Sequence, residues 1–171
     1  MKAVLRSAKP YWIYLMLTGK KKIEVGKDFP KSADWDKTVE LYCSNDKRSF
    51  NRIPEKDREW MRKYLGKVAC RFICLKLEKF TVGSLRCDDI EELACLSYSE
   101  MLNYFYKPNE LDGKTVKFGY AWHISDLQIY DTPKVLGEFK QKVKKCTNGV
   151  YYSVKKPLTR PPQSWQYVEV L

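Results

Sequence analysis

The sequence predicts an α+β fold, a mixed and mostly antiparallel β-barrel with about three helices inserted. Short runs rich in β-branched and aromatic residues recur along the chain, and clear helix signals interrupt them at three places. A length of 171 residues with 44% hydrophobic content suits one domain around one core. Since no internal repeat or low-complexity segment divides the chain, we expect residues 1–171 to form a single domain.

The first part of the chain predicts three strands around one helix. Residues 2–6 read as a strand, and Pro10 suits the first turn of a helix. Gly19 ends that helix, because glycine readily takes the positive φ found after helix C-termini. Residues 21–27 alternate in polarity and predict a second strand, and residues 38–43 predict a third.

The middle of the chain carries the other two helix signals. Residues 54–64 predict a polar helix, and Ser97 with Glu100 three residues later forms a capping-box pattern for another. Between them, residues 68–77 are rich in β-formers and predict a central barrel strand. Cys70 and Cys74 lie on its apolar face, which places them inside the barrel.

The last third predicts the closing strands. Residues 118–130 are aromatic and β-branched, with Gly119 and Asp126 as candidate bends or a bulge. Residues 151–154 and 167–171 predict further strands, joined by the proline-rich connection 157–164.

The charge is high and segregated, which indicates an anionic partner. The chain carries 32 Lys and Arg against 21 Asp and Glu, a net charge of +11 and a pI near 9.3. Basic residues concentrate in 1–27 and 140–160, whereas acidic residues cluster in 88–92. A basic surface on one side follows if the two ends of the chain meet; the alternative is a solvated lysine face that binds nothing.

Several classes of function are disfavoured. The six cysteines form no CxxC pair and His123 is the only histidine, so we expect reduced cysteines in a cytoplasmic protein with no metal and no cofactor. Residues 11–17 are apolar but short and lead straight into lysines, so we expect neither a signal peptide nor a membrane span. No GxGxxG, Walker or GxSxG motif is present. The oligomeric state stays undecided.

The most informative segment is 19–27, where lysines gather beside one carboxylate after a glycine turn. Together with the opening strand, the aromatic segment 119–123 and the segment 162–165, it resembles the ASCH domain family of the PUA-like superfamily. The family signature is Gly-x-Lys-x-x-Glu-x-Arg; Gly19, Lys21 and Glu24 match it, and Gly26 stands at the arginine position. The resemblance covers most of the chain, with residues 44–65 resembling an insertion.

The resemblance implies a PUA-like pseudo-barrel with a cleft between the first helix and the sheet. Lys21 and Glu24 would face a ligand there, either RNA or a modified nucleoside. Some members of the family are amidohydrolases acting on N4-acetylcytidine and others are ribonucleases, so catalysis by Lys21 and Glu24 is an alternative to binding alone. Glu91 or Glu92 would then supply a second carboxylate. A further alternative is a protein–protein adaptor that docks an acidic partner through the helix 54–64.

The residues expected to contact RNA or a nucleoside lie in the basic runs and the proline-rich loop. They are Lys9, Lys20, Lys22, Lys27, Lys144, Lys145, Arg160, Gln163, Ser164 and Trp165. The lysines could equally be surface decoration, and Trp165 could equally belong to the core. His123 fits a packed, hydrogen-bonded residue better than a general base.

The departure from the signature at Gly26 leaves three interpretations. Residues two apart in a strand share a face, so the missing arginine would have sat beside Glu24 as a planar fork. Lysine cannot reproduce that fork. Either Lys27 or Arg6 compensates, or activity is reduced, or the glycine is a chance or engineered substitution.

Overall fold

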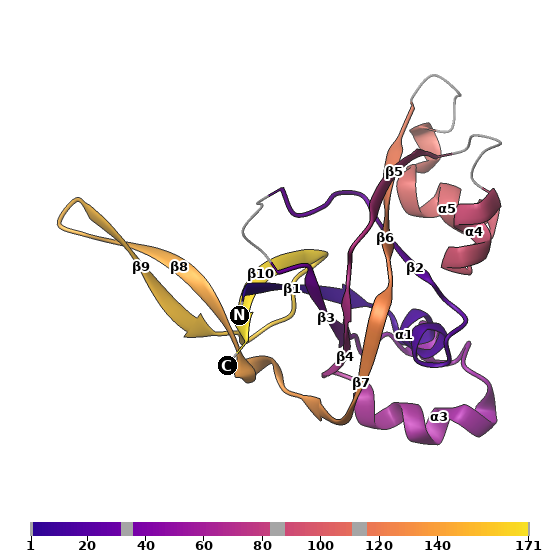
Figure 1. Ribbon diagram of the computed structural model, residues 1–171, viewed down its shortest axis with the longest axis horizontal. Helices are drawn as coiled ribbons and strands as arrows, with labels where there is room; N and C mark the ends of the chain where they lie inside the picture. Colours follow the sequence, from indigo (N-terminus) through magenta and orange to yellow (C-terminus); the bar gives the residue numbers. More distant parts are fainter. Residues whose placement is uncertain (1, 32–35, 83–87, 111–115, 171) are drawn as a thin grey trace.

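Two β-sheets and five α-helices make up the computed structural model, which describes residues 2–31, 36–82, 88–110 and 116–170 (Figure 1). The larger sheet has seven strands in the order β7-β4-β3-β1-β10-β8-β9, and the smaller has three in the order β2-β6-β5. Only β1 and β3 run parallel; all the other paired strands are antiparallel. The predicted α+β, mostly antiparallel architecture is therefore confirmed.

The strands of the larger sheet include both ends of the chain. They are β1 (Lys2–Ala8), β3 (Thr38–Cys43), β4 (Val68–Ile73), β7 (Ser125–Lys134), β8 (Phe139–Thr147), β9 (Val150–Pro157) and β10 (Trp165–Val170). Lys2 of β1 lies opposite Glu169 of β10. The first and last strands thus pair directly, which was the condition for bringing the two basic ends together.

The smaller sheet consists of β2 (Ile23–Gly26), β5 (Leu77–Thr81) and β6 (Phe118–His123). The run predicted as one strand over 68–77 ends at Ile73, and the chain enters the other sheet at Leu77. The run over 118–130 divides in the same way, with Ile124 between β6 and β7. Because strands change sheet at these two breaks, the described residues form two sheets with open edges, and a closed barrel is not confirmed.

The helices are more numerous than the three predicted. They are α1 (Pro10–Leu17), α2 (Lys47–Phe50), α3 (Glu55–Met61), α4 (Asp88–Ala94) and α5 (Tyr98–Phe105), with 3-10 turns at Arg62–Tyr64, Pro108–Glu110 and Leu136–Glu138. In Figure 1, α4 and α5 lie beside the smaller sheet, and α3 lies at the foot of the larger one. Ser97 caps α5 in the predicted capping box with Glu100. The stretch 44–65, expected to be an insertion, contains α2, α3 and one 3-10 turn.

The adaptor hypothesis depends on the surface of α3. Met61 is fully buried, whereas Trp60 is 37% exposed. The Trp60 ring packs against Tyr14 and Tyr64, with centroids 6.0 and 6.2 Å away. Since both rings lie within the same chain, α3 offers a partner less apolar surface than the sequence suggested.

Packing in the core explains why residue 119 is a glycine. A Cβ atom on Gly119 would lie 2.3 Å from Cζ of Phe80 and 2.7 Å from Cζ of Phe105, so the rings of β5 and α5 occupy the space where a side chain would be. Trp122, on the same strand, is fully buried. The smaller sheet therefore packs closely onto α5, which forms one wall of the site described below.

Burial also sets the reactivity of the cysteines. Desolvation raises the pKa of Cys43 to about 12 and that of Cys74 to about 11, and burial raises the pKa of Cys70 as well. Cys146 is exposed on β8, and Cys87 lies outside the described residues.

A thiol with a raised pKa stays protonated at neutral pH and is a poor nucleophile, so iodoacetamide is expected to label Cys146 before Cys43, Cys70 and Cys74 in the native protein. Cys43, Cys70 and Cys74 should react only after unfolding. Peptide mass spectrometry over a time course of labelling measures this order. Equal labelling rates for Cys43 and Cys146 in native protein would contradict the buried environment of Cys43.

The β8–β9 hairpin leaves the body of the molecule (Figure 1). Asn148 and Gly149 form its two-residue turn with φ angles of 51° and 77°. Positive φ at both central positions is the geometry of a type I′ hairpin turn, which Asn-Gly favours. The basic run around Lys144 and Lys145 is therefore one strand of a projecting hairpin rather than part of the molecular body.

Candidate functional site

A cleft of about 860 Å³ lies where the end of β1 meets α1, α2, α5 and the proline-rich loop. Its size is in the range of small-ligand sites. The loop is held to β1 by two hydrogen bonds: the Ser7 amide donates to the Ser164 carbonyl at 3.0 Å, and the Ser7 hydroxyl donates to the Pro162 carbonyl at 2.7 Å. The C-terminal loop is thus fixed as one wall of the cleft.

The turn after α1 directs Lys21 into the cleft. Gly19 adopts φ of 72°, and the amides of Lys20 and Lys21 both donate to the carbonyl of Leu15. The next amide, of Lys22, donates to the carbonyl of Leu93 on α4 at 2.7 Å. This turn buries Lys21 and leaves Lys20 and Lys22 exposed.

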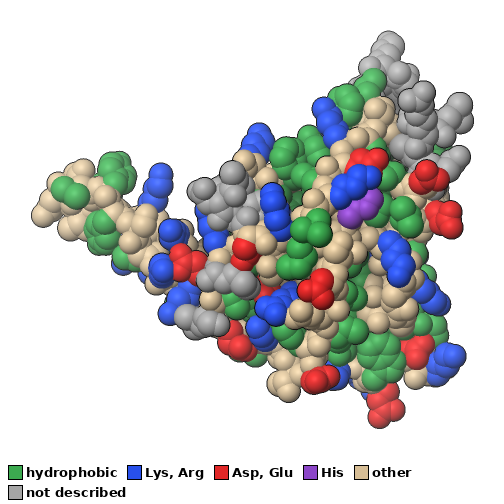
Figure 2. Space-filling model, viewed as in Figure 1, with side chains coloured by type: hydrophobic (Ala, Val, Ile, Leu, Met, Phe, Trp, Pro, Cys, Tyr) green, Lys and Arg blue, Asp and Glu red, His purple; other side chains and the backbone are tan. Residues whose placement is uncertain are grey.

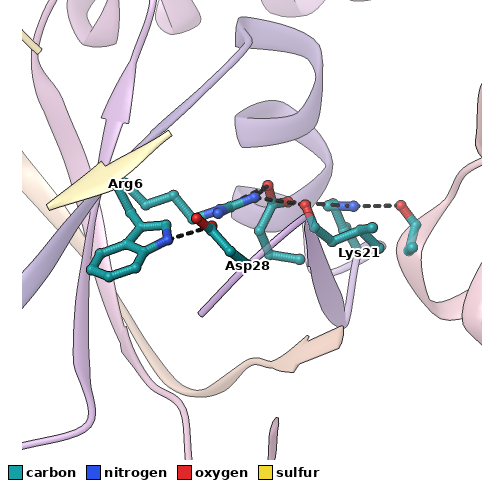
Figure 3. Close-up of polar contacts among 7 residues, drawn as sticks. Arg6, Lys21 and Asp28 are labelled. Atoms are coloured by element: carbon teal, nitrogen blue, oxygen red, sulfur yellow. Dashed lines mark hydrogen bonds and ion pairs between the residues drawn. The ribbon is translucent and has the colours of Figure 1, made fainter. Parts of the chain in front are cut away.

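The floor of the cleft is a buried cluster of Arg6, Glu24 and Lys21 (Figure 3). Nε and Nη2 of Arg6 both donate to Oε1 of Glu24 at 3.2 Å, and Nη2 also donates to the Val25 carbonyl at 2.6 Å. Nζ of Lys21 lies 3.5 Å from Oε2 of Glu24 and donates to the Ala94 carbonyl at 2.6 Å. We call these three residues the charged floor.

Burial makes the charged floor electrostatically sensitive. Arg6 and Lys21 are each 3% exposed and Glu24 is 7% exposed. Desolvation lowers the pKa of Lys21, and the nearby Glu24 carboxylate opposes that shift. Nη1 of Arg6 is buried and has no hydrogen-bond partner within the described part of the chain. The side chain of Tyr104 on α5 interacts with the Arg6 guanidinium, which connects this wall of the cleft to the charged floor.

Arg6 also accounts for the glycine at the arginine position of the signature. A Cβ atom on Gly26 would lie 3.1 Å from Nη1 of Arg6 and 3.0 Å from Nε1 of Trp122. Arg6 stacks over the Trp122 ring, with its Cζ 5.1 Å from the ring centroid. A guanidinium therefore lies beside Glu24 after all, but it comes from β1 instead of β2.

Aromatic side chains and a second arginine line the walls of the cleft. Trp12 of α1 and Tyr104 of α5 both line it. The Arg52 guanidinium lies 4.1 Å from the ring centroid of Tyr11 and 4.9 Å from that of Trp12, and it forms a 2.8 Å ion pair with Glu100. Since Arg52 follows α2 and Glu100 belongs to α5, this ion pair connects two walls of the cleft.

Some of the residues predicted from sequence meet in the cleft and others do not. Lys9, Lys21, Glu24, Gln163 and Ser164 line it. The remaining predicted residues lie outside its lining: Lys20, Lys22, Lys27, Glu92, Lys144, Lys145, Arg160 and Trp165. In the first group, Lys9 follows β1, Lys21 precedes β2, Glu24 lies on β2, and Gln163 and Ser164 belong to the loop that is hydrogen-bonded to Ser7 of β1.

Several excluded residues have identifiable roles of their own. Glu92 is exposed on α4, and the carboxylate that reaches the cleft from this region is Glu100. Trp165 is half-buried and donates from Nε1 to Asp28 at 2.6 Å. Nε2 of His123 lies 3.1 Å from Oε2 of Glu78, which fits the packed, hydrogen-bonded interpretation of that histidine.

Sequence reasoning missed most of the cleft wall. The missed lining residues with polar or aromatic side chains include Arg6, Trp12, Arg48, Arg52, Asn103 and Tyr104, together with Asp46 and Glu100. Only Arg6 carried a signal, because a cation was required beside Glu24. The others come from α1, α2 and α5, and their meeting depends on helix packing that no local pattern encodes.

The described residues were also compared with the requirements of a metal site and of a membrane-spanning helix. Over residues 2–31, 36–82, 88–110 and 116–170, no three His, Cys, Asp or Glu side chains are grouped as a metal site would require. Within these ranges no helix combines the length and apolar content needed to span a bilayer.

The comparisons with known proteins identify the fold. No family model and no curated protein matches the sequence. Among solved structures, a crystal structure of ASCH from Zymomonas mobilis matches with a TM-score of 0.57 at 15% identity, over 98% of this chain and 87% of that chain. A serine-to-alanine variant of that protein matches with a TM-score of 0.59 at 14% identity, over 98% and 88%. A tyrosine-to-phenylalanine variant gives 0.55 at 15% identity, over 99% and 91%. The chain has an ASCH-like fold, as the signature around Lys21 indicated.

Proposed function

We propose that this chain, with its ASCH-like fold, binds RNA by taking one base or modified nucleoside into the cleft above the charged floor. The observation that carries the proposal is the buried Arg6 guanidinium in the lining of the cleft, which Glu24 holds on one edge and with which the Tyr104 side chain interacts. An arginine held in a fixed orientation is suited to recognise a carbonyl or ring nitrogen by a directed hydrogen bond.

The charged floor offers a donor beside an acceptor. Two of the lone-pair positions of Glu24 receive Arg6, and Oε2 also faces Lys21 at 3.5 Å. An ionised carboxylate has about four such positions, so capacity for a ligand N–H donor is left. Bases and their modified forms present donors and acceptors side by side on one edge, which matches this pair.

The walls supply the remaining features of a nucleotide site. Tyr104 provides an aromatic ring on which a base can stack, whereas the Trp12 ring is already contacted by Arg52 and Lys21 at 4.9 and 5.3 Å. Five basic side chains, Arg6, Lys9, Lys21, Arg48 and Arg52, line the cleft against the three acidic ones, Glu24, Asp46 and Glu100. The excess of positive charge favours a phosphate at the mouth, where Lys9 and Arg48 are exposed.

Replacing Tyr104 by alanine is expected to weaken binding by about 5- to 150-fold, because loss of one base–aromatic stack costs about 1–3 kcal/mol. Tyr104 is 40% exposed, so the substitution should leave the fold intact. The measurement is a titration with the four ribonucleosides, N4-acetylcytidine and short single-stranded RNA, followed by tryptophan fluorescence, since Trp12 lines the same cleft.

Tyr98 provides the matched control for that experiment. It is 50% exposed on the same helix, but it does not line the cleft. Tyr98→Ala should therefore bind as the parent does, and Tyr104→Phe should retain most of the affinity. Equal losses for Tyr98→Ala and Tyr104→Ala, or no binding of any probe by the parent, would refute the proposed site.

The hydrolase alternative is supported by one observation, the lowered pKa of Lys21 beside Glu24. A lysine with a lowered pKa is a better base or nucleophile at neutral pH. Against this, Nζ of Lys21 already donates to the Ala94 carbonyl, and the Arg6 guanidinium holds Glu24 in a fixed position. Both side chains thus act as fixed hydrogen-bonding groups, so binding is the better-supported function.

Mass spectrometry of the same RNA and nucleoside mixtures would reveal turnover, which Lys21→Ala would abolish if the enzyme hypothesis held.

A further inference from the structure

The β8–β9 hairpin carries an exposed basic and aromatic surface that no feature of the fold explains. Beyond Lys140, β8 has only β9 as a partner, because its pairing with β10 is confined to Phe139 and Lys140. About seven further residues reach the turn, so the hairpin extends on the order of 20 Å past the sheet. Figure 2 shows blue basic side chains along its base and green apolar ones near its tip.

The lysines of the hairpin outnumber their counter-ions. Residues 139–157 contain six lysines and no acidic residue. Glu169 pairs with Lys142 and Lys155 near the base. Lys144, Lys145 and Lys156 are exposed and form no ion pair within the described part of the chain. Positive charge is therefore left available toward the tip.

The tip combines that charge with aromatic rings. Tyr151 is 77% exposed and Tyr152 is 44% exposed. With Lys144 and Ser153 they line a hollow of about 410 Å³, and the Tyr152 hydroxyl lies 3.2 Å from Oγ1 of Thr147, which fixes its ring. Exposed lysines on an edge hairpin can merely prevent aggregation, but that role does not require exposed tyrosines.

We infer that this hairpin is a second RNA-contacting element, an arm that binds a single-stranded flank of the RNA whose base enters the cleft. By the register of β8 and β9, Lys144 and Tyr151 share one face of the hairpin, and Lys145, Tyr152 and Lys156 share the other. On the face that the strand follows, the lysines contact phosphates and the tyrosine stacks on an unpaired base. A single strand fits because its bases are free to stack, whereas the deep major groove of an RNA duplex excludes side chains. The inference rests on the proposed function only for the identity of the ligand as RNA.

The chain connects the arm to the cleft over a short distance. Pro157 ends β9, and Pro161 already lines the cleft. Four residues span at most about 14 Å, so the base of the arm lies within a few nucleotides of the cleft. One continuous strand of RNA can therefore occupy both elements.

The test compares variants that remove the same charge from different places. Lys144→Ala/Lys145→Ala changes the arm, and Lys56→Ala/Lys107→Ala removes two exposed lysines from α3 and from the end of α5. Fluorescence anisotropy with a labelled single-stranded oligouridylate should show about tenfold weaker binding for the arm variant and less than about twofold for the control. The slope of log affinity against log salt should flatten by about 1.4 for the arm variant, at about 0.7 per phosphate contact.

The stacking component has its own pair of variants. Tyr151→Ala should weaken oligouridylate binding by about 5-fold or more, and Tyr151→Phe should restore it because the ring is retained. These side chains are exposed, so unchanged thermal unfolding is expected for both variants. Equal losses in the arm and control lysine variants, or full affinity in Tyr151→Ala, would overturn the inference.

Two further measurements distinguish RNA binding by the arm from nucleoside binding in the cleft and from membrane binding by the arm. Nucleoside titration should be unchanged in the arm variants, because a nucleoside occupies only the cleft. If Tyr104→Ala loses nucleoside binding but keeps arm-dependent RNA binding, the cleft and the arm are supported independently of each other. Failure of every variant to bind nucleosides, with arm-dependent RNA binding intact, would reject the cleft proposal alone. Arm-dependent binding to phosphatidylserine vesicles without binding to oligouridylate would reject the arm as an RNA contact.

Discussion

Replacing Glu24 by leucine is expected to destabilise the protein by about 3–5 kcal/mol, one of the two largest effects that the structure predicts for a single substitution. Within the described part of the chain, Glu24 is the counter-ion shared by two buried cations, Arg6 at 3.2 Å and Lys21 at 3.5 Å. Its removal leaves both charges desolvated without an opposing one. Urea unfolding monitored by tryptophan fluorescence gives the change in the free energy of unfolding.

The charged floor can then be tested as a functional rather than a stabilising device. Buried charge clusters are often replaceable by apolar side chains of similar volume without loss of stability. The variant Arg6→Met/Lys21→Met/Glu24→Leu is therefore expected to recover most of the stability lost in Glu24→Leu. It should nevertheless fail to bind nucleosides, because the donor and acceptor have gone.

Either measurement can contradict the proposed role of the charged floor. A cost below about 1 kcal/mol for Glu24→Leu would mean that water or rearrangement compensates the two cations. A triple variant that still bound nucleosides would remove the charged floor from the binding site. Retained stability without binding would show that the cluster is kept for its ligand, since stability alone does not require it.

The local elements were predictable wherever a short-range signal exists. Pro10 and Gly19 bound the first helix, and Ser97 with Glu100 begins α5, because these signals depend on neighbours within a single turn. Lys21 and Glu24, which the resemblance to the ASCH signature singled out, line the same cleft, and only two residues separate them along the chain. The lysine is buried by the glycine turn just before it.

The remaining features depend on packing between distant segments. Arg6 reaches Glu24 from another strand, and the cleft also receives Tyr104 from α5 and Arg52 from the segment after α2. The division into two sheets follows from breaks at 74–76 and at Ile124, which periodicity cannot distinguish from a continuous strand. For β8 a signal was present in Asn148-Gly149, but its lysine-rich strand lacks the apolar face on which strand prediction relies.

Restoring the signature arginine at position 26 is expected to damage the protein rather than improve it. A Cβ atom there already meets Nη1 of Arg6 at 3.1 Å, Nε1 of Trp122 at 3.0 Å and the Asp28 carbonyl at 3.1 Å. The longer side chain would also bring a second guanidinium against that of Arg6. Overpacking and an unpaired buried charge together predict a loss of at least about 3 kcal/mol for Gly26→Arg, measured by urea unfolding. Gly26→Ala isolates the steric part.

The double variant Arg6→Ala/Gly26→Arg decides whether the two arginine positions are equivalent. If the fold requires a guanidinium beside Glu24, the arginine at position 26 can occupy the space that Arg6 vacates. The double variant should then lose less free energy of unfolding than the sum of the losses in Arg6→Ala and Gly26→Arg. Contacting residues commonly show such couplings of about 0.5–3 kcal/mol. Losses of stability that simply add would show that the guanidinium must come from β1, and that its presence beside Glu24 is not enough. Tighter nucleoside binding by Gly26→Arg alone would instead mean that the glycine is a lesion and that Arg6 does not fill the place of the signature arginine.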